Sequence, residues 1–280
     1  MNETHLKNIV KLALNEDLGK GDITTNNLIP ESAQAEAHFI FKSEGIVCGL
    51  NVAQCVLRTF SKKISFRRLV SEGSRVKKQT VVAVVKGPAR DILSAERVAI
   101  NFLTHLSSIA THTRVFVDQI KPYSSKLFDT RKTTPLLRQL ERYAVKIGGG
   151  NNHRFDLSEM AMIKDNHRSM LGKHGLKQAV GMIKDKTKKK VVLEVDTWEE
   201  LKEGLTSKAE IILLDNMTPA QVQRAVRLRN EIKSKVLLEA SGGISLNKVR
   251  TYAKTGVERI SVGSLTSVKE GVDISLDFVV

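Results

Sequence analysis

Five cationic residues spaced among glycines and hydroxyls could bind the oxygen atoms of an anion. They are Arg131, Lys132, His153, Arg154 and Lys164. An arginine guanidinium binds a carboxylate through two parallel hydrogen bonds, whereas a lysine ammonium acts as a mobile point charge. A group of lysines and arginines is most simply a solvated surface. These cations do not form a run, however, and Arg131 and Lys164 each come at the end of a short apolar segment. We therefore interpret the group as a binding site.

The elements that must position these residues are short apolar runs that alternate with helical stretches. From residue 126 onward the runs are 126–128, 160–163, 191–195, 211–214, 236–238 and 259–262. Their starts are about 20 to 35 residues apart, which is the length of a βα unit. This rhythm predicts an α/β fold with an incomplete (β/α) barrel. A doubly wound sheet is the alternative, but no Gly-x-Gly-x-x-Gly follows an early strand.

Residues of functional types follow these runs, at the strand end where barrel enzymes hold their chemistry. Any single one could be incidental, but six in succession indicate a site. The two late glycine turns resemble places where backbone amides bind a phosphate. The strand-end residues are Arg131, Lys132, Lys164, Glu194, Asp215, Ser241, Gly242, Gly243, Gly263 and Ser264.

Two carboxylates in the middle of this series could serve a metal or a sugar. Glu194 and Asp215 could hold ribose hydroxyls, or waters around a Mg²⁺ that is bound mostly by substrate phosphates. No His, Cys and Asp set has the spacing of a dedicated metal site. For His153 and His167, hydrogen bonding within loops and a catalytic role are equally open.

The first third of the chain lacks the regular βα rhythm. We expect a helix over 1–18, a strand over 35–42, a helix over 51–60 and strands over 64–70 and 80–86. A long helix follows over 94–120, with a break near residues 107–108, and Arg97 lies beside its apolar stripe. This part resembles a small α+β domain.

Charge and cysteine content narrow the class of protein. The chain has 45 basic and 30 acidic residues and a net charge of +15. This charge fits either anionic small substrates or nucleic acid. Aromatic interleaving and a recognisable nucleic-acid-binding module are missing, so we expect no nucleic-acid partner. Cys48 and Cys55 form no disulfide framework, and neither a signal peptide nor a membrane span is evident. We expect a cytoplasmic protein.

The motifs taken together resemble the quinolinate phosphoribosyltransferase family, also called nicotinate-nucleotide pyrophosphorylase (decarboxylating). The resemblance covers essentially the whole chain in order. Its motifs are 16–25 (EDLGKGDITT), 45–49 (GIVCG), 95–97 (AER), 129–135 (DTRKTTP), 148–154 (GGGNNHR), 163–167 (IKDNH), 194–196 (EVD), 214–216 (LDN), 241–244 (SGGI) and 262–264 (VGS).

The resemblance implies an activity and an architecture. Quinolinate and phosphoribosyl pyrophosphate would give nicotinate mononucleotide, pyrophosphate and CO₂, with Mg²⁺, in NAD synthesis. An open α/β sandwich domain over 1–108, joined by 266–280, would precede a barrel domain over 109–265. The protein would be a homodimer, with Arg97 supplied across the interface.

The resemblance also implies residue roles. Arg131, Arg154 and Lys164 would bind the two quinolinate carboxylates, and Lys132 and His153 would line the pocket beside Thr130. Glu194 and Asp215 would face the ribose and the metal. The 5′-phosphate would be bound by Ser241, Gly242, Gly243, Val262, Gly263 and Ser264.

Two positions depart from the family pattern, and two further enzyme-family readings stay open. Arg168 stands where an apolar residue is usual, and Val192 stands where a second Glu is frequent. A barrel aldolase could use Lys164 as a Schiff base, although Arg131 and Arg154 suit a dicarboxylate better. A relative associated with molybdenum transport shares several motifs, and the intact 153–154 and 163–167 segments argue against it.

Overall fold

The computed structural model describes residues 3–171, 175–268 and 271–279. The chain divides into two units, each described here by itself. The first unit comprises Met1–Arg114, Thr133–Gly149 and Thr266–Val280, and the second comprises Val115–Lys132 and Gly150–Leu265. Residues 1–2, 172–174, 269–270 and 280 of the predicted domains lie outside the described residues.

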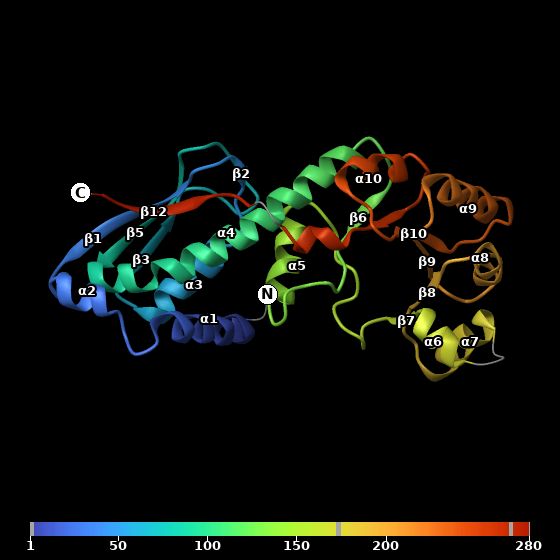
Figure 1. Ribbon diagram of the computed structural model, residues 1–280, viewed down its shortest axis with the longest axis horizontal. Coiled ribbons are helices and arrows are strands. Elements are labelled where there is room, and N and C mark those ends of the chain that lie inside the picture. Colours follow the sequence, from blue (N-terminus) through green and yellow to red (C-terminus); the bar gives the residue numbers. More distant parts are fainter. Residues whose placement is uncertain (1–2, 172–174, 269–270, 280) are drawn as a thin grey trace. The chain divides into compact units, whose positions relative to one another are not determined.

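The first unit is built on a four-stranded antiparallel sheet in the order β12-β1-β5-β3 (Figure 1). Alternate residues of β1, among them Phe39 and Phe41, are fully buried, as a half-covered strand requires. The bounds of the strands are β1 Gln34–Phe41, β2 Gly45–Ile46, β3 Ser65–Arg68, β4 Arg75–Val76, β5 Thr80–Pro88 and β12 Ile274–Val279. The last strand pairs with the first, so segments from both ends of the chain share one sheet.

Helices accompany this sheet. They are α1 Glu3–Leu18, α2 Ile23–Leu28, α3 Leu50–Phe60, α4 Ala89–Ile120 and α5 Arg138–Ile147. The break expected near residues 107–108 of α4 is wrong. The hydroxyl of Ser107 donates to the carbonyl of Cys48 over 3.0 Å, and that of Ser108 donates to the carbonyl of Thr104 over 2.6 Å. Both hydroxyls are therefore satisfied without interrupting the helix.

The second unit is a parallel six-stranded sheet in the order β6-β11-β10-β9-β8-β7. Its elements are β6 Lys126–Phe128, β7 Ala161–Ile163, α6 Asp165–Met170, α7 Leu176–Lys186, β8 Val191–Val195, α8 Trp198–Leu205, β9 Ile211–Asp215, α9 Pro219–Glu231, β10 Leu237–Ser241, α10 Leu246–Ala253, β11 Arg259–Ser261 and the 3-10 turn η1 Gly263–Thr266. The alternation of strand and helix confirms the predicted α/β class.

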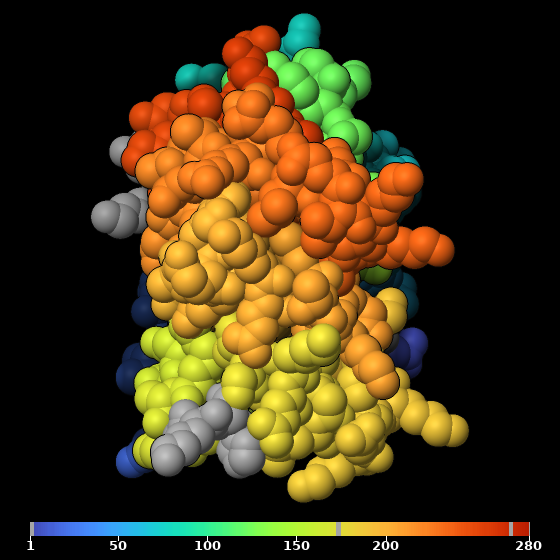
Figure 2. All heavy atoms as spheres, turned by 90° about the vertical axis from the view of Figure 1, so that its right-hand side faces the viewer, coloured from blue at the N-terminus to red at the C-terminus, as the bar shows by residue number. Residues whose placement is uncertain are grey.

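Local sequence explains why the helices begin where they do. Thr197 and Glu200 cap α8 reciprocally, and Thr218 and Gln221 do the same for α9, whose first residue is Pro219. All five residues of β8 are buried, as expected for a strand covered on both faces. Figure 2 shows one face of this unit, formed by residues coloured yellow to orange, the colours of the segment that contains α7, α8 and α9.

The barrel is incomplete, as predicted. A short segment at Asn151 runs parallel to β6 through a single bridge to Phe128, beyond the β6 edge of the sheet. Within the described residues, no strand pairing joins this segment to β7 at the other edge. No described helix is both long and apolar enough to cross a membrane.

Candidate active site

Side-chain alternation brings the central carboxylates of the second unit onto one face of the sheet. Side chains two residues apart on a strand share a face. Val192 of β8 packs with Ile211 and Leu213 of β9 in one buried cluster. Glu194 and Asp215 each follow a member of that cluster by two residues, so they lie on the same face. We call the face of the sheet that carries Glu194 and Asp215 the inner face. Both residues lie near the carboxyl ends of their strands.

Neighbouring strands and loops add the other predicted residues. The strand register pairs Asp215 of β9 with Ser241 of β10. A Cβ placed on Gly263 would lie 3.7 Å from Oγ1 of Thr130 and 3.2 Å from Cδ of Lys132, so the loops after β11 and β6 meet. The structure therefore brings together, at the carboxyl ends of the strands, Thr130, Lys132, Lys164, Glu194, Asp215, Ser241 and Gly263.

Lys164 and Glu194 form an ion pair at the ends of β7 and β8. Nζ of Lys164 donates to Oε2 of Glu194 over 3.0 Å. The lysine side chain is 44% exposed and the glutamate side chain is 9% exposed, so the ammonium reaches outward from a buried carboxylate. The backbone N–H of Lys164 donates to Nδ1 of His167 over 3.0 Å, which gives this histidine a role in shaping the loop. An ammonium has three donors, so Lys164 can bind an anionic ligand as well as Glu194.

Arg131 and Arg154 come close together because the segment at Asn151 runs beside β6. Arg154 is buried, and its Nη1 donates to the carbonyl of Met160 over 2.8 Å. Burial and the neighbouring charge of Arg131 lower the pKa of the Arg154 guanidinium. Among the described residues, Nε of Arg131 is buried without a hydrogen-bond partner. Two guanidiniums that repel each other and retain an unmatched donor suit an anion with more than one negative charge.

His153 is buried, and both nitrogens of its ring face groups of the protein. Its Nε2 lies 3.3 Å from Oε1 of Glu239, and its Nδ1 accepts the N–H of Arg154 over 2.7 Å. The backbone N–H of His153 donates to Oδ1 of Asp129 over 2.6 Å. In this structure the ring supports the loop that carries Arg154.

Glu239 is a buried carboxylate that sequence reasoning missed. It has no exposed surface, and it accepts hydrogen bonds from Nε of Arg259 over 2.5 Å and from the hydroxyl of Ser261. Burial opposes its ionisation, but the hydrogen bond from His153, followed by the charges of His153 and Arg259, lowers its pKa to about 2. The available signal was a lone acidic residue in an otherwise apolar strand, LLEAS.

Asp129 was also missed as a site residue. It is fully buried directly after β6, and its Oδ2 accepts Nδ2 of Asn152 over 2.6 Å. Together with the bond to the His153 N–H, this holds the segment 152–154 beside the end of β6. The signal was an acidic residue placed immediately after an apolar run.

The glycine turn after β10 has a shape that only glycine allows. Gly242 has a φ of +97°, and a Cβ there would lie 2.6 Å from the backbone N of Asn216. That N donates to the carbonyl of Ser241 over 2.9 Å, and Nδ2 of Asn216 donates to Oδ2 of Asp215 over 2.7 Å. Gly243, with a φ of +57°, has open space where a Cβ would be. The turn thus has room for a ligand beside its backbone.

The remaining predicted residues lie elsewhere or have structural surroundings. Arg97 is exposed on α4, in the first unit. Arg168, one of the two departures from the family pattern, is paired with Asp196 over 2.8 Å and with Glu200. Val192, the other, is buried in the apolar cluster of the inner face.

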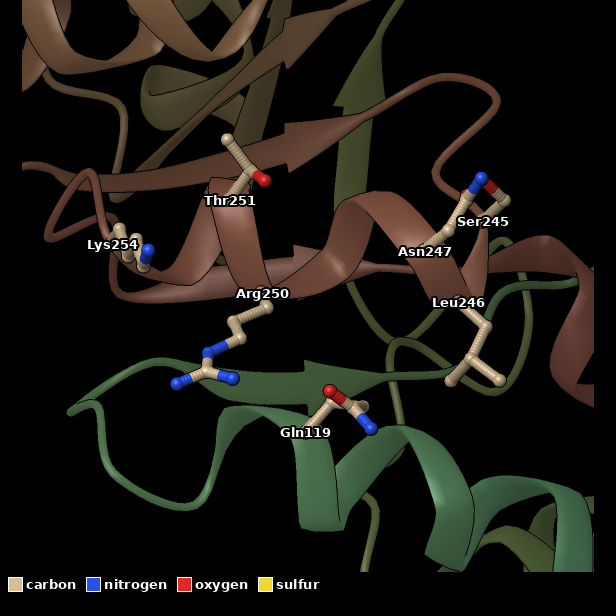
Figure 3. Close-up of a pocket in the computed structure, with 7 residues that line it drawn as sticks. All are labelled: Gln119, Ser245, Leu246, Asn247, Arg250, Thr251 and Lys254. Carbon is tan, nitrogen blue, oxygen red and sulfur yellow. The ribbon is translucent and has the colours of Figure 1, made fainter.

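A hollow of about 490 Å³ lies away from these residues, between α10 and the end of α4. Figure 3 shows Arg250 and Gln119 approaching it from opposite sides. None of the residues predicted for the site lines this hollow. Within the described residues, no group of three or more His, Cys, Asp or Glu side chains could hold a metal ion.

Most of the chain matches one family of known proteins. Residues 22–107 match the N-terminal domain of quinolinate phosphoribosyl transferase, and residues 109–277 match its C-terminal domain. The chain belongs to the quinolinate phosphoribosyl transferase family. The resemblance drawn from the sequence motifs is confirmed.

Relatives of this chain, which include known nicotinate-nucleotide pyrophosphorylases, match it along nearly its whole length. A probable nicotinate-nucleotide pyrophosphorylase (carboxylating) of Methanocaldococcus jannaschii is 39% identical over 279 residues, covering 97% of this chain and 96% of the relative. A quinolinate phosphoribosyltransferase (decarboxylating) of Nicotiana tabacum is 37% identical, covering 97% and 81%. The structure of the nicotinate-nucleotide pyrophosphorylase from Francisella tularensis superposes with a TM-score of 0.94 at 36% identity, covering 100% and 98%.

Proposed function

We propose that the chain transfers the phosphoribosyl group of phosphoribosyl pyrophosphate to the ring nitrogen of quinolinate. Loss of pyrophosphate and CO₂ then gives nicotinate mononucleotide for NAD synthesis. Besides the family, the observation that carries the proposal is the Arg131 and Arg154 pair. Quinolinate carries two adjacent carboxylates, and each would relieve the repulsion between these guanidiniums while meeting the buried Nε of Arg131.

The quinolinate end of the site would use the cations of the early strands. Arg131, Arg154 and Lys164 would bind the two carboxylates. Lys132, whose side chain lies against Gly263, would line the pocket with Thr130. His153 would help to position the loop that carries Arg154, because its Nε2 faces the buried carboxylate of Glu239.

The phosphoribosyl end would use the middle and late strands. Glu194 and Asp215 share the inner face and would bind ribose hydroxyls. The turns after β10 and β11 would bind the 5′-phosphate through backbone amides and hydroxyls, at a place where barrel enzymes commonly hold phosphate. The residues assigned to the phosphate are Ser241, Gly242, Gly243, Val262, Gly263 and Ser264.

The chemistry needs orientation and charge stabilisation more than a protein nucleophile. The ring nitrogen attacks the anomeric carbon, and the bonding electrons leave with pyrophosphate. The nitrogen becomes a pyridinium. When the adjacent carbon–carboxylate bond breaks, CO₂ leaves and the electron pair stays on the ring carbon, where the positive charge of the neighbouring nitrogen stabilises it. The carbanion then takes a proton from solvent. Cations around both ends of the substrates stabilise the departing charge and align the reacting atoms.

We propose Mg²⁺ as the cofactor. The donors present fit a metal that keeps most of its ligands as water and substrate phosphate, as Mg²⁺ prefers. Glu194 is already paired with Lys164, and Asp215 with Asn216, so each has an oxygen left for a metal-bound water. When bound, the ion would neutralise charge on the pyrophosphate.

We also propose a cytoplasmic homodimer whose site is completed by Arg97 of the second subunit. Exposure of Arg97 on α4 leaves its guanidinium accessible to another chain. The two cysteines are free, which suits a reducing compartment. The cations that bind the anionic substrates, rather than nucleic-acid binding, would account for part of the excess of basic residues.

The proposal is tested by mixing purified protein with quinolinate, phosphoribosyl pyrophosphate and Mg²⁺. Nicotinate mononucleotide and CO₂ are followed by mass spectrometry, and nicotinate replaces quinolinate as the control. We expect product when quinolinate is the acceptor and none when nicotinate replaces it. Folded protein that binds phosphoribosyl pyrophosphate without forming product would require another acceptor. Trapping of a carbonyl substrate on Lys164 by borohydride would instead support the aldolase.

A further inference from the structure

Arg168 joins two segments of the second unit through two carboxylates. Its Nη2 donates to Oδ2 of Asp196 over 2.8 Å, and its Nη1 pairs with Oε1 of Glu200. The arginine side chain is only 12% exposed, so this is a partly buried ion pair. Oε2 of Glu200 accepts the backbone N–H groups of Asp196 and Thr197 over 3.0 and 3.3 Å. Arg168 therefore contacts the loop after β8 through Asp196 and the first turn of α8 through Glu200, and Glu200 is itself bonded to that loop.

The joined segments are the ones that carry Lys164 and Glu194. The backbone N–H of Arg168 donates to the carbonyl of Lys164 over 3.0 Å, one helical turn earlier. Asp196 follows Glu194 by two residues. Helix α6 has only six residues, Asp165–Met170, and none of them is buried. A helix this short that buries no residue gains little from apolar packing, so polar contacts contribute much of its attachment.

The charges around Arg168 are consistent with a persistent contact. Burial lowers the pKa of Arg168, but the hydrogen bond to Asp196 and the charge of Glu200 outweigh it and raise the pKa. Burial raises the pKa of Glu200, but hydrogen bonds from the backbone N–H groups of Asp196 and Thr197, and then the charge of Arg168, lower it below its ordinary value. Both partners thus stay ionised in the folded protein.

We infer that Arg168 is a positioning residue, whose ion pairs with Asp196 and Glu200 hold α6 against the loop after β8 and so keep Lys164 in register with Glu194. The inference rests on the proposed function, in which Lys164 binds a quinolinate carboxylate. The backbone pairing of β7 with β8 ends at Ile163 and Leu193. Beyond that point, and without the guanidinium, α6 would be held beside β8 through the Lys164–Glu194 pair, and that lysine is 44% exposed. Quinolinate would then have to order the loop on binding, which weakens its affinity.

The test compares Arg168→Met, Arg168→Lys and a control, Lys184→Met, in the full chain. Lys184 is also a largely buried cation paired with a carboxylate, Glu210, but it lies near the amino ends of the strands. KM and kcat are measured for each substrate, quinolinate binding is measured by calorimetry, and Tm is recorded. For Arg168→Met we expect KM and Kd for quinolinate to rise about tenfold. For Arg168→Lys, which keeps one ion pair, we expect a rise of about threefold.

Lys184→Met should leave both constants at the wild-type value even if its Tm falls. Unchanged quinolinate KM and Kd in Arg168→Met, or an equal change in Lys184→Met, would overturn the inference and leave the proposed function standing. Wild-type protein that neither turns over nor binds quinolinate would instead defeat the proposed function, and the inference with it. If Arg168→Met does not fold, Asp196→Asn decides, because Asp196 is half exposed and its loss removes one contact. A quinolinate KM unchanged in Asp196→Asn would then overturn the inference.

Discussion

Nε2 of His153 lies 3.3 Å from Oε1 of Glu239, a carboxylate with no exposed surface. This contact joins the loop that carries Arg154 to the middle of β10. Arg259 and Ser261 of β11 share the same carboxylate. One buried charge thus links three segments beneath the candidate site, and its removal would have measurable consequences.

Replacing Glu239 by Gln should lower the free energy of unfolding by about 3 kcal/mol at neutral pH, because it removes the charge of a fully buried carboxylate that pairs with Arg259. Urea unfolding monitored by fluorescence and circular dichroism measures this. Glu258→Gln is the matched control, since Glu258 also pairs with an arginine, Arg229, but is 32% exposed. The free energy of unfolding of Glu258→Gln should fall by less than about 1 kcal/mol. Equal losses in the two variants would contradict the role given to Glu239.

The same carboxylate predicts how stability depends on pH. The pKa of Glu239 is about 2 in the folded protein, compared with an ordinary value of 4.5. Its ionised form therefore contributes stability above pH 4.5, and that contribution is lost as the pH falls from 4.5 toward 2. In that window the wild type should lose stability more steeply than Glu239→Gln. Parallel curves for the two proteins would show that another group carries the acid sensitivity.

Arg131→Met should lower the activity of the protein without lowering its free energy of unfolding. The substitution removes one of two guanidiniums that repel each other and a buried unmatched donor. We expect the free energy of unfolding to stay the same or rise by about 1 kcal/mol. Quinolinate kcat/KM should nevertheless fall about a hundredfold, because a bidentate contact to a carboxylate is lost. Arg227→Met, at an exposed position on α9, should change neither quantity.

Lys164→Ala should reduce turnover about a hundredfold, since an ammonium that contacts a substrate carboxylate is lost. Lys188→Ala removes an equal charge from an exposed loop and should leave turnover at the wild-type level. Comparable activity in the two variants would remove Lys164 from the site.

Gly242→Ala should weaken phosphoribosyl pyrophosphate binding, because its Cβ would be 2.6 Å from the backbone N of Asn216 and must displace the turn. Gly256→Ala is the control. Its φ is +82°, but the nearest atom to its Cβ would be 3.8 Å away. Both variants should lose about 1 to 2 kcal/mol of stability from the left-handed conformation. Only Gly242→Ala should raise KM for phosphoribosyl pyrophosphate; a similar rise in Gly256→Ala would point to a global cause.

Much of this protein could be predicted from the sequence, because the signals involved are local. Apolar runs at the spacing of βα units predicted all six strands of the second unit, and their bounds differ from the observed ones by three residues at most, at the end of β10. Capping residues and glycine turns likewise depend on neighbours a few positions away. Residue types at the strand ends predicted that Lys164, Glu194 and Asp215 follow neighbouring strands, where the structure has them, and the ordered motifs identified the family.

Tertiary structure alone decided which of these residues touch. Arg131 meets Arg154 because the segment at Asn151 lies beside β6, and His153 meets Glu239 because β6 pairs with β11, which pairs with β10. Arg168 stands where the family usually has an apolar residue, and its neighbours in the sequence do not explain it. In the folded chain it pairs with Asp196 and Glu200. A charged side chain can be buried only where an opposite charge or hydrogen-bond partner meets it. Those partners lie about 30 or more residues away along the chain. Local pattern determines the elements and the chemical types at their ends, whereas the strand order and register determine which charges become neighbours.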